Sequence, residues 1–168
     1  MNRKNLSYKL VVLVASLLLA ASLSHSARAD DAPALVGVWK LVSFKIQLVD
    51  TTETKDALGP KPHGRMILTK NGYITNFRVA AGRKPPKTDA DRVELLQTMA
   101  VWTGRYRADG NKVIINIDAS WTEFLTGTET VRTYSVEGNK LTFTNAISSS
   151  LFFPGRAAVG VEIFEREE

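Results

Sequence analysis

Residues 65–79 read RMILTKNGYITNFRV, and this stretch decides the fold class of the chain. Apolar residues alternate with polar ones on both sides of Asn71 and Gly72, which is the pattern of two half-buried strands. Asn-Gly between two alternating runs is the strongest short signal for a β-hairpin. The stretch therefore predicts a strand over 65–70, a tight turn, and a returning strand over 73–79.

Six more strands are predicted around this hairpin, most of them separated by short turns. They cover residues 35–49, 101–108, 112–119, 128–136, 140–147 and 159–166. A helix is predicted over 88–100, with Thr88 as its N-cap and acidic residues in its early turns, and we expect it to cover part of the sheet. Eight antiparallel strands joined in sequence order predict an all-β, up-and-down barrel with one short helix. A two-sheet sandwich is the alternative architecture.

The first 29 residues have the three parts of a secretory signal peptide. Basic residues lie in the first nine positions, an apolar run covers 10–23, and Ala27-Arg28-Ala29 is a small-x-small cleavage site. The apolar run of about 14 residues is shorter than the roughly 20 that span a bilayer, although an uncleaved anchor is the alternative. We therefore expect cleavage after Ala29, a periplasmic or secreted domain over 30–168, and no stable membrane anchor.

Removal of the signal peptide changes the charge and the chemistry that remain. The whole chain has 22 basic and 17 acidic residues, a net charge of +5, but four basic residues lie in the first 29. The mature part has a net charge of +1, which gives no support for nucleic-acid binding. The chain has no cysteine, and His63 is the only histidine after residue 29, so thiol chemistry, cysteine-ligated metals and multi-histidine metal sites are excluded. We expect neither a metal nor a cofactor, and the oligomeric state stays open.

Several blocks of the sequence resemble the bacterial and fungal lipocalin-like domain family. Residues 35–43, LVGVWKLVS, are similar to its opening, in which Gly-x-Trp on the first strand precedes Leu-Val-Ser. Further similar blocks follow in order at Gly72-Tyr73, Gly104-Arg105-Tyr106, Trp121 with residues 127–132, and Phe164-Glu165-Arg166. The resemblance covers nearly all of residues 35–166. It implies a lipocalin-like barrel and, by analogy, the binding of a small hydrophobic molecule.

The resemblance also implies how one end of the barrel is closed. In lipocalin-like barrels the tryptophan of the first strand closes that end, and an arginine from a late strand stacks over it. Trp39 takes the first role, and Arg132 and Arg166 are the candidates for the second. A guanidinium over an indole ring gains about 1–2 kcal/mol and needs hydrogen-bond partners for its donors, so we favour a structural role over ligand contact.

The residues predicted to bind a ligand are mostly aromatic. Alternation points Arg132 and Tyr134 inward from one strand and Asn145 inward from the next. A mostly apolar pocket with a few orienting polar groups suits a small hydrophobic ligand, and plain core packing is the competing interpretation for each residue. The predicted ligand-binding residues are Tyr73, Phe77, Trp102, Tyr106, Trp121, Arg132, Tyr134 and Asn145.

A barrel enzyme of the isomerase, cyclase or hydrolase type is the alternative function, and we assign no catalytic residue. Family members often carry a histidine where this chain reads IINID at 114–118. Asn116 and Asp118 face solvent if Ile115 faces inward, and only an inward Asp118 could become a general base. His63 is expected to be a solvated loop residue. A third possibility is an interaction module that docks a partner through residues 151–154.

Overall fold

The computed structural model describes residues 32–51, 53–147, 153 and 155–168. The signal peptide and most of the 151–154 segment lie outside the described residues, so both stay predictions. None of the helices in the described part of the chain has the length and apolar character needed to cross a membrane. The described elements are α2 (Ala32–Leu35), β1 (Gly37–Leu48), β2 (Thr54–Asp56), β3 (His63–Leu68), β4 (Tyr73–Val79), α3 (Asp89–Gln97), β5 (Met99–Asp109), β6 (Lys112–Ser120), the 3-10 turn η1 (Glu123–Leu125), β7 (Glu129–Glu137), β8 (Lys140–Ile147) and β9 (Ala158–Arg166).

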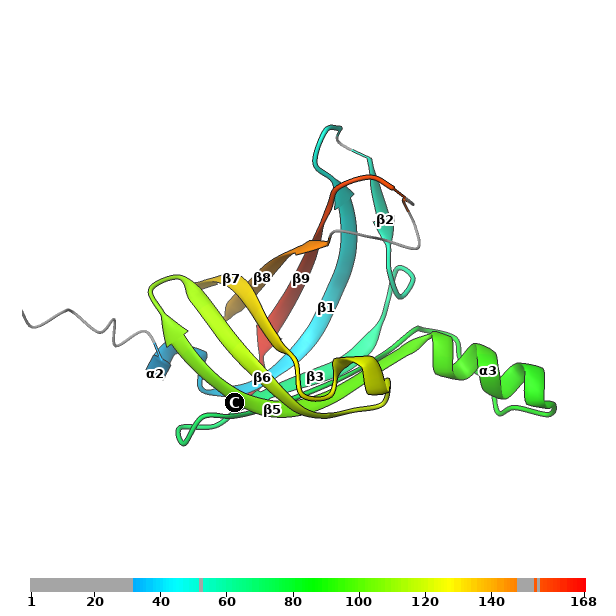
Figure 1. Cartoon of the computed structure of the whole chain (residues 1–168), viewed down its shortest axis with the longest axis horizontal. Coiled ribbons are helices and arrows are strands. Elements are labelled where there is room, and N and C mark those ends of the chain that lie inside the picture. The colour runs from blue at the N-terminus through cyan, green and yellow to red at the C-terminus, as the bar shows by residue number, and fades with distance from the viewer. Residues whose placement is uncertain (1–31, 52, 148–152, 154) are drawn as a thin grey trace, which may run out of the picture. The chain divides into compact units, whose positions relative to one another are not determined.

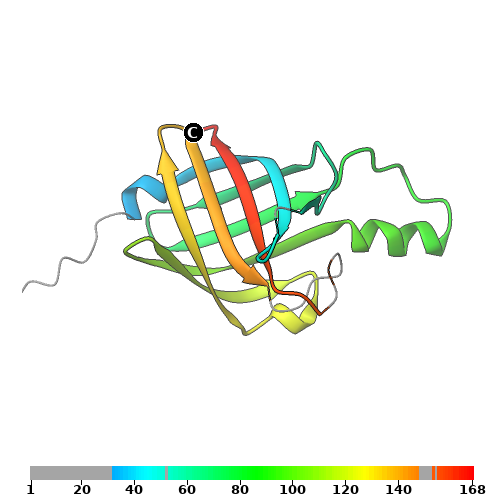
Figure 2. The same cartoon turned by 90° about the horizontal axis from the view of Figure 1, so that it is seen from above.

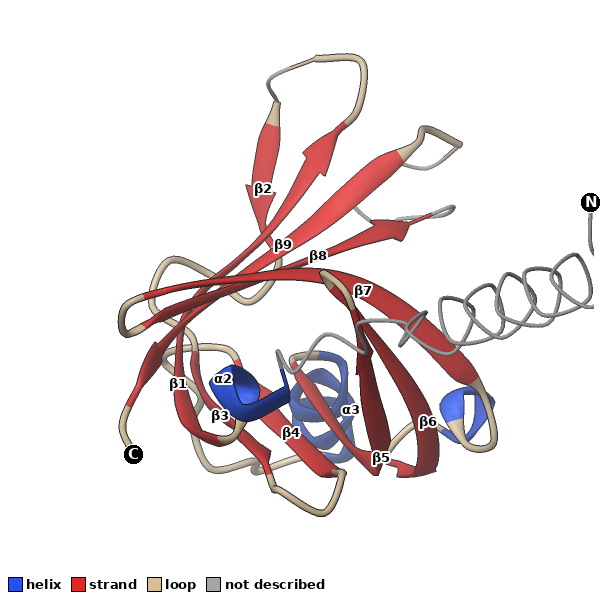
Figure 3. Cartoon of the chain, turned by 90° about the vertical axis from the view of Figure 1, so that its left-hand side faces the viewer, coloured by secondary structure: helices blue, strands red, loops and turns tan. Residues whose placement is uncertain are grey.

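The strands form one closed antiparallel barrel, as the sequence predicts. Strands β3 to β9 pair in sequence order, β1 pairs with β3, and β1 also pairs with β9 along most of its length (Figures 1 and 2). Seen from the end that carries α2, these eight strands surround one interior (Figure 3). The short β2 is an addition, because it pairs with the far part of β1 in a segment that we expected to be a loop.

Strand β1 changes which of its alternate residues face the interior. Trp39 and Leu41 are buried in its first half, whereas Ile46 and Leu48 are buried in its second half. The pairing with β9 shifts register between Leu41 and Ser43, which marks a β-bulge. A bulge inserts one extra residue and so exchanges the two faces of a strand beyond it. The strand can therefore send apolar side chains inward from both parities.

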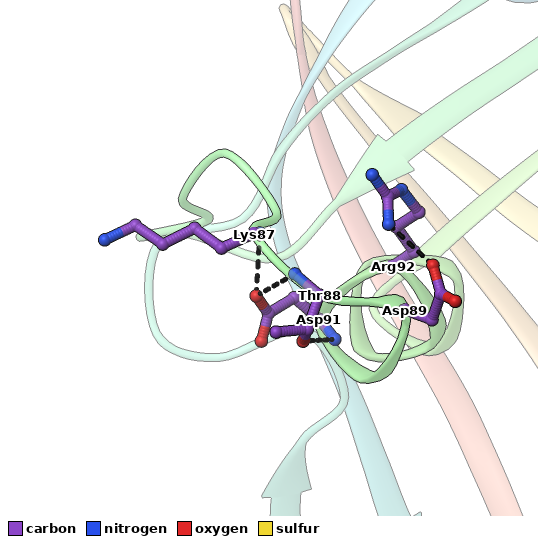
Figure 4. A network of polar contacts seen from close by, with 5 residues as sticks. All are labelled: Lys87, Thr88, Asp89, Asp91 and Arg92. Carbon is purple, nitrogen blue, oxygen red and sulfur yellow. Dashed lines mark hydrogen bonds and ion pairs between the residues drawn. The ribbon is translucent and has the colours of Figure 1, made fainter.

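Helix α3 is shorter than predicted and does not cover the barrel. Thr88 is its N-cap, and Thr88 and Asp91 form a reciprocal capping box in which each side chain accepts a hydrogen bond from the other's backbone (Figure 4). None of its residues is buried, and it projects away from the barrel (Figures 1 and 2). The expectation of a covering helix is wrong because Val93 and Leu96 are 52% and 50% exposed and offer too narrow an apolar stripe to pack.

Buried apolar residues form one large and one smaller cluster in the barrel. Trp39, Phe143 and Phe164 have no exposed surface, and the rings of Phe143 and Phe164 meet edge to face with centroids 6.3 Å apart. Tyr106 and Tyr134 belong to the same buried cluster. Burial of these large rings supplies much of the stability of a domain without disulfides.

Candidate ligand-binding site

One end of the barrel is closed by Trp39 and Arg166, which we call the closed end. The indole Nε1 of Trp39 donates a hydrogen bond of 2.8 Å to the carbonyl of Leu35, the last residue of α2. The guanidinium of Arg166 stacks 4.0 Å from the centroid of the Trp39 ring. Its Nη1 and Nη2 donate to the carbonyls of Val36 and Ala34 at 2.7 and 2.6 Å. Of the two predicted candidates, Arg166 is therefore the arginine that covers Trp39.

Four polar side chains of the described residues are buried in the barrel, and we call them the inner cluster. Asn76 and Arg78 come from β4, Arg132 from β7 and Glu162 from β9. The two oxygens of Glu162 are divided between the two arginines. Its Oε2 lies 2.6 Å from Nη1 of Arg78, and its Oε1 accepts a hydrogen bond of 2.8 Å from Nη1 of Arg132. Three strands that are far apart in sequence are thus joined across the interior.

Aromatic rings hold both guanidinium groups of the inner cluster. Arg78 lies 4.3 Å from the centroid of the Phe44 ring, and Arg132 lies 5.3 Å from that of Trp102. Gly64, the cross-strand neighbour of Arg78, has no side chain and so lets the backbone of β3 lie close to that of Arg78. A Cβ atom at this glycine would lie only 2.9 Å from Cα of Arg78. The backbone and the rings together fix where the two positive charges stand.

Several polar atoms of the inner cluster make no hydrogen bond to another described residue. Apart from Nη1 of Arg78 and Oε2 of Glu162, which face each other in the ion pair, these atoms are Nε of Arg78, Nε of Arg132 and both the oxygen and the nitrogen of the Asn76 side chain. Asn76 has no exposed surface, so water from outside the barrel does not reach it directly. A buried polar group without a partner costs about 1–3 kcal/mol. Such groups collected in one place indicate a site that is completed by something else.

The ionisation of the inner cluster follows from its burial and its pairing. Burial by itself would raise the pKa of Glu162, but the combined attraction and hydrogen bonds of Arg132 and Arg78 outweigh it and lower that pKa. Burial lowers the pKa of Arg132, with Glu162 opposing this effect and Arg78 adding to it. Its guanidinium nevertheless stays protonated, because arginine is not deprotonated in proteins. Glu162 and Arg132 are therefore both charged at neutral pH.

Five of the eight predicted ligand-binding residues lie on the inner face. Trp102, Tyr106, Arg132 and Tyr134 are buried, and Asn145 is half-buried on the same face of β8 as Phe143. The hydroxyl of Tyr106 donates to the carbonyl of Thr69 at 2.9 Å, which ties β5 to the β3–β4 turn. Their inward placement agrees with the prediction, while ligand binding by these residues stays a prediction.

The other three predicted residues do not lie inside the barrel. Tyr73 and Phe77 are 46% and 47% exposed, because the inward side chains of β4 are those at 74, 76 and 78. Tyr73 instead lies on the outer surface under the guanidinium of Arg105, at 3.7 Å. Trp121 is 38% exposed in the connection after β6. The placement of these three aromatic residues in the interior was wrong.

Sequence reasoning missed Asn76, Arg78 and Glu162 as interior residues. All three are polar residues at inward positions, so an analysis that sends apolar side chains inward assigns β4 the opposite face. Strand β9 does carry a usable signal, because Glu162 shares its parity with Ala158, Gly160 and Phe164. A lone acid among small and aromatic inward positions marks a buried charge that needs a partner.

The residues weighed for catalysis lie on the outside. Asn116 and Asp118 are exposed while Ile115 is buried, as the sequence predicts, and Asp118 accepts a hydrogen bond of 2.5 Å from the hydroxyl of Thr103. His63 is the exposed first residue of β3. Within the described part of the chain, no three His, Cys, Asp or Glu side chains gather as a metal site would require.

A hollow lies outside the barrel, between residues 80–87 and α3. Its volume is about 420 Å³, and its lining includes three basic and two acidic side chains, so its charges nearly balance. Arg83 is anchored there by a hydrogen bond of 2.9 Å from Nη2 to the carbonyl of Leu95. The charged residues of this lining are Arg83, Lys84, Lys87, Asp91 and Glu94.

Comparison with known proteins identifies the family. A model of the lipocalin-like domain matches residues 36–166. The chain belongs to the lipocalin-like domain family. This lipocalin-like protein is similar to a crystal structure of a lipocalin-like protein from Bacteroides uniformis, with 13% identity, a TM-score of 0.42, and coverage of 79% of this chain and 97% of that one. An uncharacterized protein from Bacteroides eggerthii has 14% identity, a TM-score of 0.39, and coverage of 78% and 98%. No curated protein matches the chain.

Proposed function

We propose that this lipocalin-like protein is exported and binds a small, mostly hydrophobic molecule inside its barrel. One observation carries the proposal: the buried inner face is apolar except for the inner cluster. Small-molecule sites are typically lined by apolar and aromatic side chains with a few polar groups that orient the ligand. Eight-stranded barrels have interiors of a size that side chains fill or that holds one small ligand.

The two ends of the barrel suggest the direction of entry. At the closed end, α2, Trp39 and Arg166 are joined by hydrogen bonds and a stacking contact. Arg78 lies near the last residue of β4 and Asn145 near the last residue of β8, and both of these strand ends are opposite the closed end. A ligand that entered opposite the closed end would therefore meet Asn145 and the inner cluster before it met the aromatic core.

Export rests on the features of residues 1–29, namely the basic start, the short apolar run and the Ala27-Arg28-Ala29 site. Expression of the full chain in a bacterial host, followed by fractionation and N-terminal sequencing, tests it. The expected product begins at Asp30 and is found outside the cytoplasm. A cytoplasmic product that begins at Met1 would contradict export and leave ligand binding unaffected.

Native mass spectrometry of the protein purified without denaturant tests ligand binding. We expect a bound mass, or, for protein without one, binding of the neutral fluorescent probe N-phenyl-1-naphthylamine. Trp102→Phe should alter the binding of the probe because Trp102 faces the interior, and Phe77→Leu is the matched control on the outer face. Absence of a bound mass, of probe binding and of a thermal shift with a panel of lipids and aromatic molecules would refute the proposal.

A further inference from the structure

The inner cluster carries an excess of positive charge. The charged side chains buried among the described residues are Arg78, Arg132 and Glu162, so two guanidinium groups share one carboxylate. This leaves one positive charge in excess inside an apolar barrel. Buried charges are normally paired, because taking a charge out of water is costly unless an opposite charge compensates it.

The geometry of the inner cluster leaves donors available for a second carboxylate. Each arginine uses one Nη atom for Glu162, and neither forms the two parallel hydrogen bonds of a bidentate pair with that residue. A guanidinium has five N–H donors, and Nε of both arginines makes no hydrogen bond to a described residue. Two fixed guanidinium groups with free donors are suited to an incoming anion with two oxygens.

Asn76 extends this set of free donors. It is the cross-strand partner of Trp102, whose ring lies under the guanidinium of Arg132. Its side chain is fully buried and makes no hydrogen bond to a described residue. The amide can donate to one oxygen of an anion while the arginines neutralise the charge. One ligand group thus explains the donors without a described partner on β4 and, across the interior, on β7.

The surroundings of the inner cluster are suited to an apolar ligand body. Phe44, which carries the guanidinium of Arg78, packs against both of the buried apolar clusters of the barrel. Ile46 and Leu48 continue from it along the inner face of β1. A molecule with its charged end at the arginines can therefore lay its hydrocarbon part along buried apolar side chains.

We propose that the inner cluster binds the carboxylate of an apolar ligand, so that the barrel takes a hydrophobic monoanion of the fatty-acid type. Arg78 and Arg132 supply the charge, and Asn76 supplies a further hydrogen bond. Glu162 holds the two arginines in position and leaves them with one uncompensated charge. This inference rests on the proposed function, because it names the ligand class of the same interior site.

The test compares dodecanoate with dodecanol, which has the same chain and no charge. Both are titrated as competitors against bound N-phenyl-1-naphthylamine. We expect dodecanoate to bind wild-type protein about tenfold more tightly or more, the effect of gaining at least one charge-assisted hydrogen bond. Arg78→Met and Arg132→Met should each reduce this preference to near unity, and Arg78→Lys should keep part of it because it keeps the charge.

Arg105→Met is the matched control. Arg105 also lies over an aromatic ring, that of Tyr73, but on the outer surface, so its loss should leave the preference unchanged. Circular dichroism and thermal melting check that each variant folds. If a methionine variant does not fold, the ligand preference of Arg78→Lys, compared with that of the wild-type protein, tests the anion site.

The outcomes separate this inference from the proposed function. Equal binding of dodecanol and dodecanoate to the wild-type protein would overturn the anion site and leave an apolar carrier. An equal loss of preference in Arg105→Met and Arg78→Met would also overturn it, because the anion would then bind outside the barrel. Failure of the probe and of both competitors to bind would overturn both.

Discussion

The closed end and the inner cluster both contain an arginine stacked over an aromatic ring, but the contact has a different role in each. Arg166, Arg78 and Arg132 all lie over aromatic rings. Arg166 also donates to two backbone carbonyls near α2, whereas each inner arginine keeps an Nε without a described partner. A stacked arginine with bonded donors fixes the fold, and one with free donors is available to a ligand. The difference separates a stabilising site from a candidate binding site within one barrel.

The largest effect is expected at Glu162, the carboxylate that the two inner arginines share. Glu162→Gln leaves two buried guanidinium groups without a carboxylate, and we expect a loss of about 3–5 kcal/mol in the free energy of unfolding. Urea denaturation monitored by circular dichroism measures it. Glu165→Gln, on the exposed face of the same strand, is the control and should change stability little. A loss below about 1 kcal/mol for Glu162→Gln would mean that water or another group already compensates the arginines.

A smaller loss is expected when the closed end is weakened. Arg166→Met removes two hydrogen bonds to carbonyls and the stack on Trp39, and we expect a destabilisation of about 2 kcal/mol, because part of the guanidinium is exposed. Urea denaturation gives the stability, and the dodecanoate titration gives the ligand preference. Stability should fall while the preference stays unchanged. A changed preference would show that the two sites are coupled.

The dependence of stability on pH measures how much the ionised Glu162 stabilises the fold. Its pKa in the folded protein is lowered below the ordinary value of 4.5, since the effect of the two arginines exceeds that of burial. The stabilisation is therefore complete above the pKa of the unfolded chain and is lost as the pH falls through the folded value. Urea denaturation from pH 7 to pH 3 should show this loss. Arg78→Met, which removes part of the attraction, should make the dependence shallower, and an unchanged dependence would assign it to surface carboxylates.

The smallest effect is expected at α3, which belongs to neither site. Thr88→Ala removes the side chain that caps the helix and should cost about 1 kcal/mol of local helix stability. Hydrogen exchange should become faster in α3 alone, because no residue of this helix is buried. The global unfolding midpoint should not change. A lower midpoint would mean that α3 supports the barrel despite its exposure.

The turn and alternation signals of the sequence were enough to predict the barrel. The Asn71-Gly72 hairpin and the six other predicted strands form where expected, because tight turns and alternation are local properties. The ends of the elements were less certain. Residues 99 and 100 join β5 instead of the helix, since pairing with Val79 and Arg78 overrides a weak helical pattern.

The candidate site could be predicted only in part. Arg132 and Trp102 were placed in the interior correctly, because their strands bury the apolar parity. On β4 the same rule failed, since Asn76 and Arg78 are inward and Phe77 is outward. A buried charge needs an opposite charge nearby, and the contacts of Arg78 lie on β1 and β9. No local pattern contains that information.

Turns and period-two alternation act between neighbouring residues, so the amino-acid pattern alone predicts an antiparallel barrel. The resemblance to the family further implies that an arginine of a late strand covers Trp39. The folded barrel, and no local pattern, places Arg166 over Trp39 and brings Arg78, Arg132 and Glu162 together inside. The physical reason is that β1, β4, β7 and β9 approach one another only when the barrel closes, and closure sets which side chains share the interior.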